Sequence, residues 1–155
     1  MGEVQIIQFT QVQARTITGI SCETLRHWRK KNPYLAENSG KAARFNFSDL
    51  VCIAMTAQAI ETFGASISNI GLTIDPLFRK LAESRPAVLQ DQAIVIKSKN
   101  ATLCRFYEIA KLGLSGPLII VPCAPLMETM RQHLLPGLFS EPQLQIPFPP
   151  QAVGG

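Results

Sequence analysis

Six basic side chains stand between residues 22 and 44, accompanied by only two acidic ones. The basic residues are Arg26, Arg29, Lys30, Lys31, Lys41 and Arg44. Their local excess of four positive charges equals the net charge of the whole 155-residue chain, +4. Lysine and arginine bind anionic oxygens through charge-assisted hydrogen bonds. Such a run can also be an ordinary solvated helix face, but its concentration on one short segment favours contact with phosphates.

Two short helices joined by a tight turn are predicted to carry the first of these cations. Thr10 is a favourable N-cap, and Gln13 three positions later completes a possible capping box for the first helix. Gly19 supplies the backbone freedom that a tight interhelical turn needs. Ser21 is then the N-cap of a second helix over residues 22–31.

The second helix has one apolar face and one polar face. Leu25 and Trp28 lie three residues apart and are therefore assigned to the core. Glu23 and Thr24 stand in the first turn, where helix-turn-helix proteins contact base edges. Glu23 could accept a hydrogen bond from a cytosine amino group, or it could simply stabilise the positive end of the helix dipole.

A small hairpin, a wing, is predicted over residues 34–45. Asn38-Ser39-Gly40 is a turn signal at its centre, and Phe45 would anchor its return strand. Asn46 is expected to cap a helix over 47–63.

The remaining chain predicts a change of structural type. A short helix over 66–72 should be followed by a second one starting at Asp75-Pro76. Residues 84–91 are expected to be a linker. Beyond it we expect three strands, at residues 93–97, 102–109 and 118–121. A final helix over 125–135 and a proline-rich tail over 136–155 should follow them.

The predicted fold class is therefore α+β, with a mostly helical N-terminal part and a small mixed part. The expected domains are a winged helix-turn-helix over 8–84, a small dimerisation or regulatory domain over 92–135, and the tail over 136–155.

Four blocks of residues, in this order, resemble the DNA-binding domain of MerR-like transcription regulators. They are Thr18-Gly19-Ile20-Ser21, Thr24-Leu25-Arg26-His27-Trp28, Arg44-Phe45-Asn46-Phe47-Ser48-Asp49-Leu50, and Phe63-Gly64-Ala65-Ser66-Ile67 with Ile70. The resemblance covers residues 8–72, which is less than half of the chain.

The resemblance implies a winged helix-turn-helix whose second helix enters the major groove and whose wing grips the flanking backbone. Arg26 and His27 fall where the family has an Arg-Tyr pair that contacts DNA, and Arg44 matches the basic residue at the end of the wing. The chain departs from the family in having His27 in place of tyrosine. It also lacks the long helix that pairs two subunits, so the family's effector logic does not carry over.

Other classes of function find little support in the sequence. The chain has no glycine-rich phosphate loop, His-Glu-x-x-His motif or nucleophile elbow, so an enzyme is not expected. The four cysteines form no Cys-x-x-Cys pair, so we expect free thiols, no metal and no cofactor. No apolar run reaches transmembrane length. A cytoplasmic, nucleoid-associated protein is therefore expected.

These observations predict a sequence-specific regulator of transcription that binds double-stranded DNA as a homodimer, with residues 92–135 as the dimer surface. The alternatives are an architectural or excisionase-like factor that bends DNA, and an adaptor whose winged domain binds protein. The predicted DNA-binding residues are Ser21, Glu23, Thr24, Arg26, His27, Arg29, Lys30, Lys31, Lys41 and Arg44.

Overall fold

The computed structural model describes residues 7–112 and 116–134. It confirms the α+β class: helices predominate, and the strands form one antiparallel sheet of two strands and another of three. The expected tail lies outside the described residues, as does most of the turn expected at 113–116. Among the described helices, none is long and apolar enough to cross a membrane.

The elements follow one another in an order that places most helices before the larger sheet. The α-helices are α1 (Gln11–Thr18), α2 (Cys22–Arg29), α3 (Pro33–Ala36), α4 (Phe47–Phe63), α5 (Ile67–Ala82) and α6 (Cys123–Leu134). The strands are β1 (Phe9–Thr10), β2 (Arg44–Phe45), β3 (Gln92–Ile96), β4 (Ala101–Arg105) and β5 (Ile119–Pro122). Two 3₁₀-helices complete the set, η1 (Pro86–Asp91) and η2 (Phe106–Lys111).

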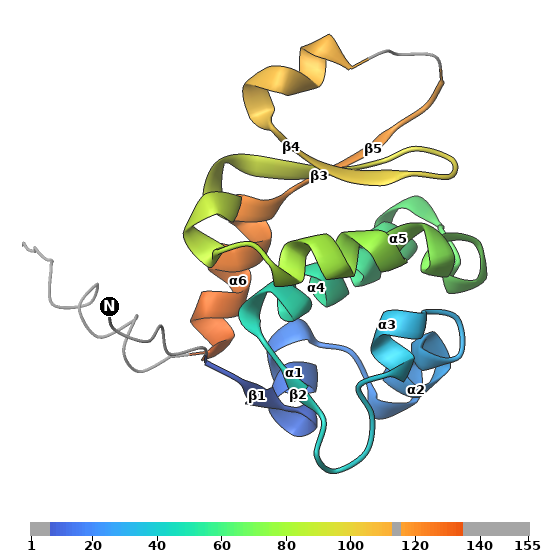
Figure 1. Ribbon diagram of the computed structural model, residues 1–155, viewed down its shortest axis with the longest axis vertical. Helices are drawn as coiled ribbons and strands as arrows, with labels where there is room; N and C mark the ends of the chain where they lie inside the picture. Colours follow the sequence, from blue (N-terminus) through green and yellow to red (C-terminus); the bar gives the residue numbers. More distant parts are fainter. Residues whose placement is uncertain (1–6, 113–115, 135–155) are drawn as a thin grey trace, which may run out of the picture.

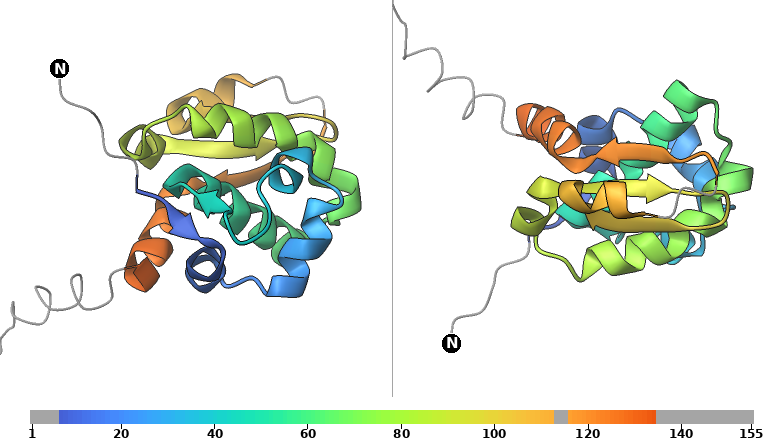
Figure 2. Two further views of the ribbon diagram at one scale, coloured as in Figure 1. Left: turned by 60° about the horizontal axis from the view of Figure 1, so that its bottom comes forward. Right: turned by 90° about the horizontal axis from the view of Figure 1, so that it is seen from above.

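The three-stranded sheet has the order β4-β3-β5, and both of its pairings are antiparallel. Helices α4, α5 and α6 lie below one face of this sheet, while η2 lies above the other face (Figure 1). Seen from above, α5 runs on the β4 side of the sheet and α6 on the β5 side (Figure 2). Helices α1, α2 and α3 and the small β1-β2 sheet occupy the opposite end of the molecule.

One continuous hydrophobic core joins the N-terminal helices to the larger sheet. Leu25 of α2, Phe78 of α5, Ile94 of β3 and Met127 of α6 are all buried members of it. The predicted assignment of Leu25 and Trp28 to the core is confirmed, since both side chains are buried. Because α4 and α1 also contact α6 directly, the sheet and the helices support each other.

The helix starts were predictable because each depends on residues close in sequence. The Thr10 side chain accepts a hydrogen bond from the Gln13 backbone N–H, and the Gln13 side chain accepts one from the Thr10 backbone N–H, which completes the capping box. Asn46 and Asp49 form the same reciprocal pair at the start of α4. That helix ends at Gly64, whose positive φ of 71° gives the left-handed C-cap that glycine favours.

The predicted break between two helices at Asp75-Pro76 is wrong, because α5 continues through Pro76 as one helix. Pro76 removes one backbone hydrogen bond, but Ile74, Leu77 and Phe78 around it are fully buried, and this packing holds the helix together. Asp75 does not cap a new helix; its carboxylate accepts from the Tyr34 backbone N–H instead.

Most of the segment over residues 84–91, expected to be a linker, is instead a short helix that is partly buried. Residues 86–91 form η1, and its Leu89 is completely buried. The three predicted strands are confirmed, although the second is shorter than expected because residues 106–111 turn into η2. The Lys97 backbone N–H donates to the Asn100 carbonyl at 2.7 Å, which closes the expected β3-β4 turn.

The four cysteines are free, and burial separates them into two pairs with different expected reactivity. Cys52 and Cys123 are inaccessible, and burial raises the pKa of the Cys123 thiol to about 12. Burial likewise raises the pKa of Cys52. Because the thiolate is the reactive form, we expect both thiols to resist a disulfide reagent in the folded protein. Cys22 and Cys104 are partly exposed.

Counting modified thiols by mass spectrometry, before and after adding denaturant, checks this expectation. We expect Cys22 and Cys104 to react first, and Cys52 and Cys123 at least about 10³-fold more slowly, as in a protein that rarely unfolds. Rapid modification of Cys123 under native conditions would contradict the described packing of α6.

Candidate nucleic-acid interface

Helices α1 and α2 meet at a three-residue turn whose geometry follows from two residues. Gly19 has a φ of 79° and ends α1, with its N–H donating to the Arg15 carbonyl. Ser21 begins α2 by accepting a hydrogen bond from the Thr24 backbone N–H at 3.0 Å. The predicted turn and N-cap are therefore confirmed, and they fix where the surface of α2 points.

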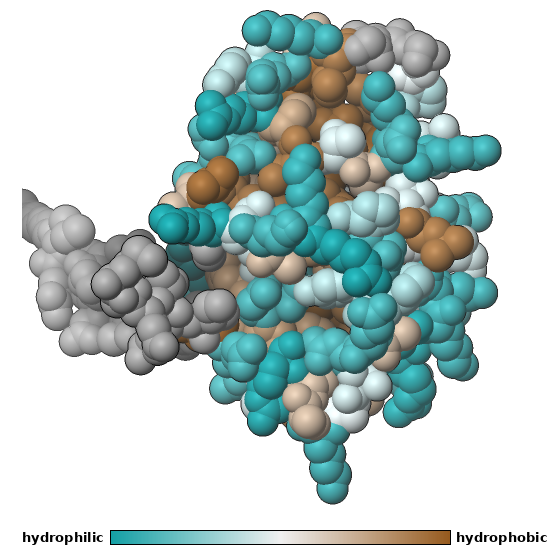
Figure 3. Space-filling view, viewed as in Figure 1, coloured by the Kyte–Doolittle hydropathy of each residue, from teal (hydrophilic) through white to brown (hydrophobic). Residues whose placement is uncertain are grey.

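Helix α2 has a buried face and an exposed face that differ sharply in charge. Leu25 and Trp28 are 1% and 4% exposed. The other face carries residues at positions i, i+3, i+4 and i+7, all of them exposed: Glu23, Arg26, His27 and Lys30. Because this spacing places side chains on one side of a helix, the four form a single stripe that carries two cations, one histidine and one carboxylate. Hydrophilic residues cover most of the corresponding end of the molecule in Figure 3.

Arg29 differs from the other predicted DNA-binding cations because its guanidinium group is bonded inside the protein. Its Nη2 donates to the Gln11 side chain and to the Asn38 carbonyl, each at 2.7 Å, and its Nε donates to the Leu35 carbonyl at 3.4 Å. Burial lowers the pKa of Arg29. Few of its donors remain for a phosphate, so the structure gives this residue a role in joining elements.

The predicted hairpin over residues 34–45 is wrong. Residues 33–36 form α3, which Asn32 caps and Pro33 begins. The strand β2 pairs with β1, with Phe45 opposite Phe9 and Arg44 opposite Thr10. The turn signal instead marks a loop over residues 37–43, which lies at the same end of the molecule as α2 (Figure 1). Phe45, expected to anchor the return strand of that hairpin, is fully buried, but in a strand that pairs with β1.

Lys41 and Arg44 are the two basic residues of this loop and the strand that follows it, and both are exposed. The Arg44 guanidinium donates to the Lys41 and Ala43 carbonyls at 3.2 and 2.8 Å. Gly40 has a φ of 85°, which permits the tight turn before Lys41. Lys41 therefore stands on a short ordered loop.

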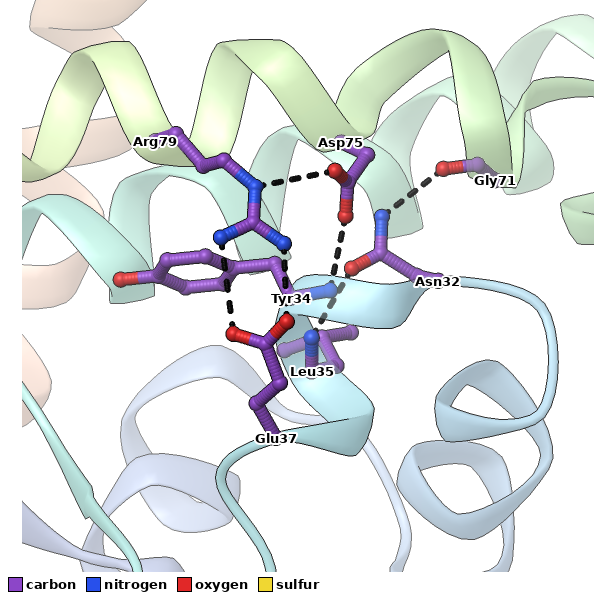
Figure 4. A network of polar contacts seen from close by, with 7 residues as sticks. All are labelled: Asn32, Tyr34, Leu35, Glu37, Gly71, Asp75 and Arg79. Atoms are coloured by element: carbon purple, nitrogen blue, oxygen red, sulfur yellow. Dashed lines mark hydrogen bonds and ion pairs between the residues drawn. The ribbon is translucent and has the colours of Figure 1, made fainter.

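A polar network fixes α3 and the end of α2 on helix α5 (Figure 4). Arg79 forms ion pairs with Glu37 and Asp75, both at 3.1 Å. Asn32 also joins α3 to α5, since its side chain donates to the Gly71 carbonyl at 2.8 Å and accepts from the Leu35 N–H. The Tyr34 ring stacks on Phe78 with centroids 4.9 Å apart. These contacts hold α2 and the loop on the rigid core.

Asp49 is a buried carboxylate that is bonded to Tyr34 of this network and has a structural role. The Tyr34 hydroxyl donates to it at 2.6 Å, and its other oxygen accepts from the Asn46 N–H at 2.9 Å. Burial raises the pKa of Asp49, against the opposing effect of these hydrogen bonds. The described residues contain no cluster of three histidine, cysteine or acidic side chains that could hold a metal.

An open groove of about 630 Å³ runs beside the exposed stripe, between the start of α2 and the end of α4. Ser21, Glu23, Thr24 and His27 line its α2 side, and Glu61 lines its α4 side. The two carboxylates reduce the positive potential there. Within this region, the basic end of α2 and the loop are therefore better suited to phosphates than the groove is.

The structure thus groups most of the predicted site residues at one end of the molecule. Exposed on α2 or just after it are Glu23, Arg26, His27, Lys30 and Lys31, whereas Thr24 is partly buried. Ser21 is exposed, but its hydroxyl is used for capping. Sequence reasoning missed Asn38, whose side chain bonds both backbone groups of Arg44. It also missed Arg15, whose Nε is the single buried side-chain polar atom without a partner in the described part of the chain.

Comparison with known proteins gives this interface no precedent. No protein-family model matches the chain, and neither a curated protein nor a solved structure is significantly similar to it. The MerR-like resemblance of residues 8–72 therefore stays a prediction.

Proposed function

We propose that the protein binds double-stranded DNA, with helix α2 in the major groove and the loop over residues 37–43 on the flanking backbone. The observation that carries this proposal is the exposed stripe of Glu23, Arg26, His27 and Lys30 on a helix whose opposite face is buried. A helix fits the major groove of B-DNA and can present such side chains to base edges. The three-residue turn before α2 matches the helix-turn-helix arrangement.

The charged residues fall into two groups, one suited to contacts with base edges and the other to contacts with phosphates. Glu23 and Arg26 lie toward the beginning of α2, where base reading is expected. Lys30, Lys31 and Lys41 are exposed beyond it, and they suit phosphates, which supply affinity without sequence information. The role that follows is a sequence-specific transcription regulator.

A single α2 offers few base contacts, so we extend the proposal to a homodimer on a repeated site. Its candidate surface is the larger sheet and the segments around it. Phe106 and Tyr107 of η2 and Ile120 of β5 are apolar or aromatic side chains left 47%, 64% and 37% exposed at that end. The DNA-binding end would then remain free in the dimer.

The salt dependence of binding to a duplex tests the proposed contacts. Each phosphate contact contributes about −0.9 to the slope of log K against log salt concentration. With up to five exposed cations at the interface, we expect a slope between about −2 and −5 per protein chain. Fluorescence anisotropy of a labelled 30-base-pair duplex, titrated at several salt concentrations, measures it. Replacing Lys41 with alanine should make the slope less negative by about one.

A slope near zero would contradict the proposal and would favour a protein-binding adaptor. Measured bending of the bound duplex separates a regulator from an architectural, excisionase-like factor, because only the latter requires a strongly bent DNA. The footprint on a dimeric complex should be symmetric.

A further inference from the structure

The loop over residues 37–43 is closed by one side chain in place of a hairpin ladder. The Asn38 amide nitrogen donates to the Arg44 carbonyl at 2.6 Å, and the Arg44 backbone N–H donates to the Asn38 amide oxygen at 3.1 Å. This two-bond pairing resembles the exchange between opposite residues of an antiparallel pair. Asn38 thereby brings together the two ends of the segment that presents Lys41.

Arg29 attaches the closed loop to α2. Its Nη2 donates to the carbonyl of Asn38 itself, and the same nitrogen also donates to Gln11 at the start of α1. Its Nε reaches the carbonyl of Leu35 in α3. One guanidinium therefore joins four segments, and arginine suits this task because its planar group carries five fixed donors.

We propose that Arg29 and Asn38 are positioning residues that hold the loop carrying Lys41 on helix α2 before DNA arrives. This inference rests on the proposed DNA binding and adds how the two contact elements keep their spacing. A loop ordered in advance loses less conformational entropy on binding. Removing either bond should therefore weaken binding through Lys41, although neither Arg29 nor Asn38 needs to touch the DNA.

A double-mutant cycle between Asn38→Ala and Lys41→Ala tests the coupling. We expect each single variant to lower affinity for the duplex about 3- to 10-fold. Each should also make the slope of log K against log salt concentration less negative by about one. The double variant should bind no more weakly than Asn38→Ala alone. Ser39→Ala, at the adjacent exposed position, is the matched control and should change nothing. Fully multiplicative effects of the two single variants would overturn the inference.

Arg29→Lys distinguishes positioning from direct phosphate contact, because lysine keeps the charge but cannot reach three acceptors with fixed geometry. We expect this variant to lose affinity about 3- to 10-fold. Arg85→Lys, the same exchange at an exposed arginine between α5 and η1, is its control and should lose none. Unchanged binding by Arg29→Lys would show that only its charge matters and would overturn the inference.

Hydrogen exchange on the DNA-free protein tests the closure of the loop by Asn38 independently of its effect on DNA binding. In Asn38→Ala the Arg44 amide, whose bond goes to Asn38, should exchange at least about tenfold faster, while the amides of α2 keep their wild-type rates. If wild-type protein binds no DNA, both proposals fail. If it binds DNA and Asn38→Ala changes neither Arg44 exchange nor affinity, only the positioning inference fails.

Discussion

Replacing Gly71 with alanine is expected to destabilise the protein by about 1–3 kcal/mol, the range found when a packed core is overfilled. Gly71 is buried within helix α5, where alanine is normally the better residue by up to about 1 kcal/mol. Here an added Cβ would lie 3.0 Å from the carbonyl carbon of Lys31 and closer still to its oxygen. Both are backbone atoms, so they cannot swing aside as a flexible side chain would.

The direction of the change in stability is informative, because alanine in place of glycine normally stabilises a helix. The Gly71 carbonyl also accepts the hydrogen bond from Asn32, so moving α5 away to relieve the clash would break that bond. Urea denaturation of the wild-type and Gly71→Ala proteins measures the difference. Leu72→Ala, at the neighbouring exposed position, is the control and should stay within about 0.5 kcal/mol of the wild type. A Gly71→Ala protein as stable as the wild type would contradict the close packing of α5 on the end of α2.

Replacing Arg26 with alanine is expected to reduce affinity for the preferred duplex by about 10- to 100-fold, the effect of losing a base-contacting arginine. Arg26 is exposed, and its guanidinium makes only a long contact of 3.9 Å to the Cys22 sulfur within the described part of the chain. Its removal should therefore leave the free energy of unfolding within about 0.5 kcal/mol of the wild type. Loss of binding without loss of stability identifies a contact residue.

The matched control for Arg26→Ala is Arg85→Ala. Arg85 is also an exposed arginine, but it lies between α5 and η1. Both variants remove one positive charge, so a purely nonspecific attraction would weaken to a similar extent in each. We expect Arg85→Ala to lower affinity less than 2-fold. Equal losses in the two variants would count against a specific role for α2.

The local parts of the fold were predictable because neighbouring residues determine them. Thr10, Ser21 and Asn46 each accept a hydrogen bond from the residue three positions on, so the chain near each one carries the whole signal. The continuation of α5 through Pro76 was not predictable in this way. It depends on the burial of Leu77 and Phe78 against other elements, which no local pattern reveals.

The same distinction applies to the candidate site. The exposed stripe of α2 follows from helical spacing once Leu25 and Trp28 are placed in the core. The internal bonding of Arg29 does not follow, because its partner Gln11 stands 18 positions earlier in the chain. The turn signal at Asn38 likewise does not reveal that its side-chain amide pairs with the backbone six positions later.

The most direct test of the central claim is selection from a pool of random double-stranded DNA, using wild-type protein at about 0.15 M salt. We predict that one short sequence is enriched over successive rounds, and that Arg26→Ala loses this enrichment while Arg85→Ala keeps it. Recovery of no preferred sequence by the wild-type protein, or the same preferred sequence by Arg26→Ala, would contradict the proposal that helix α2 reads DNA.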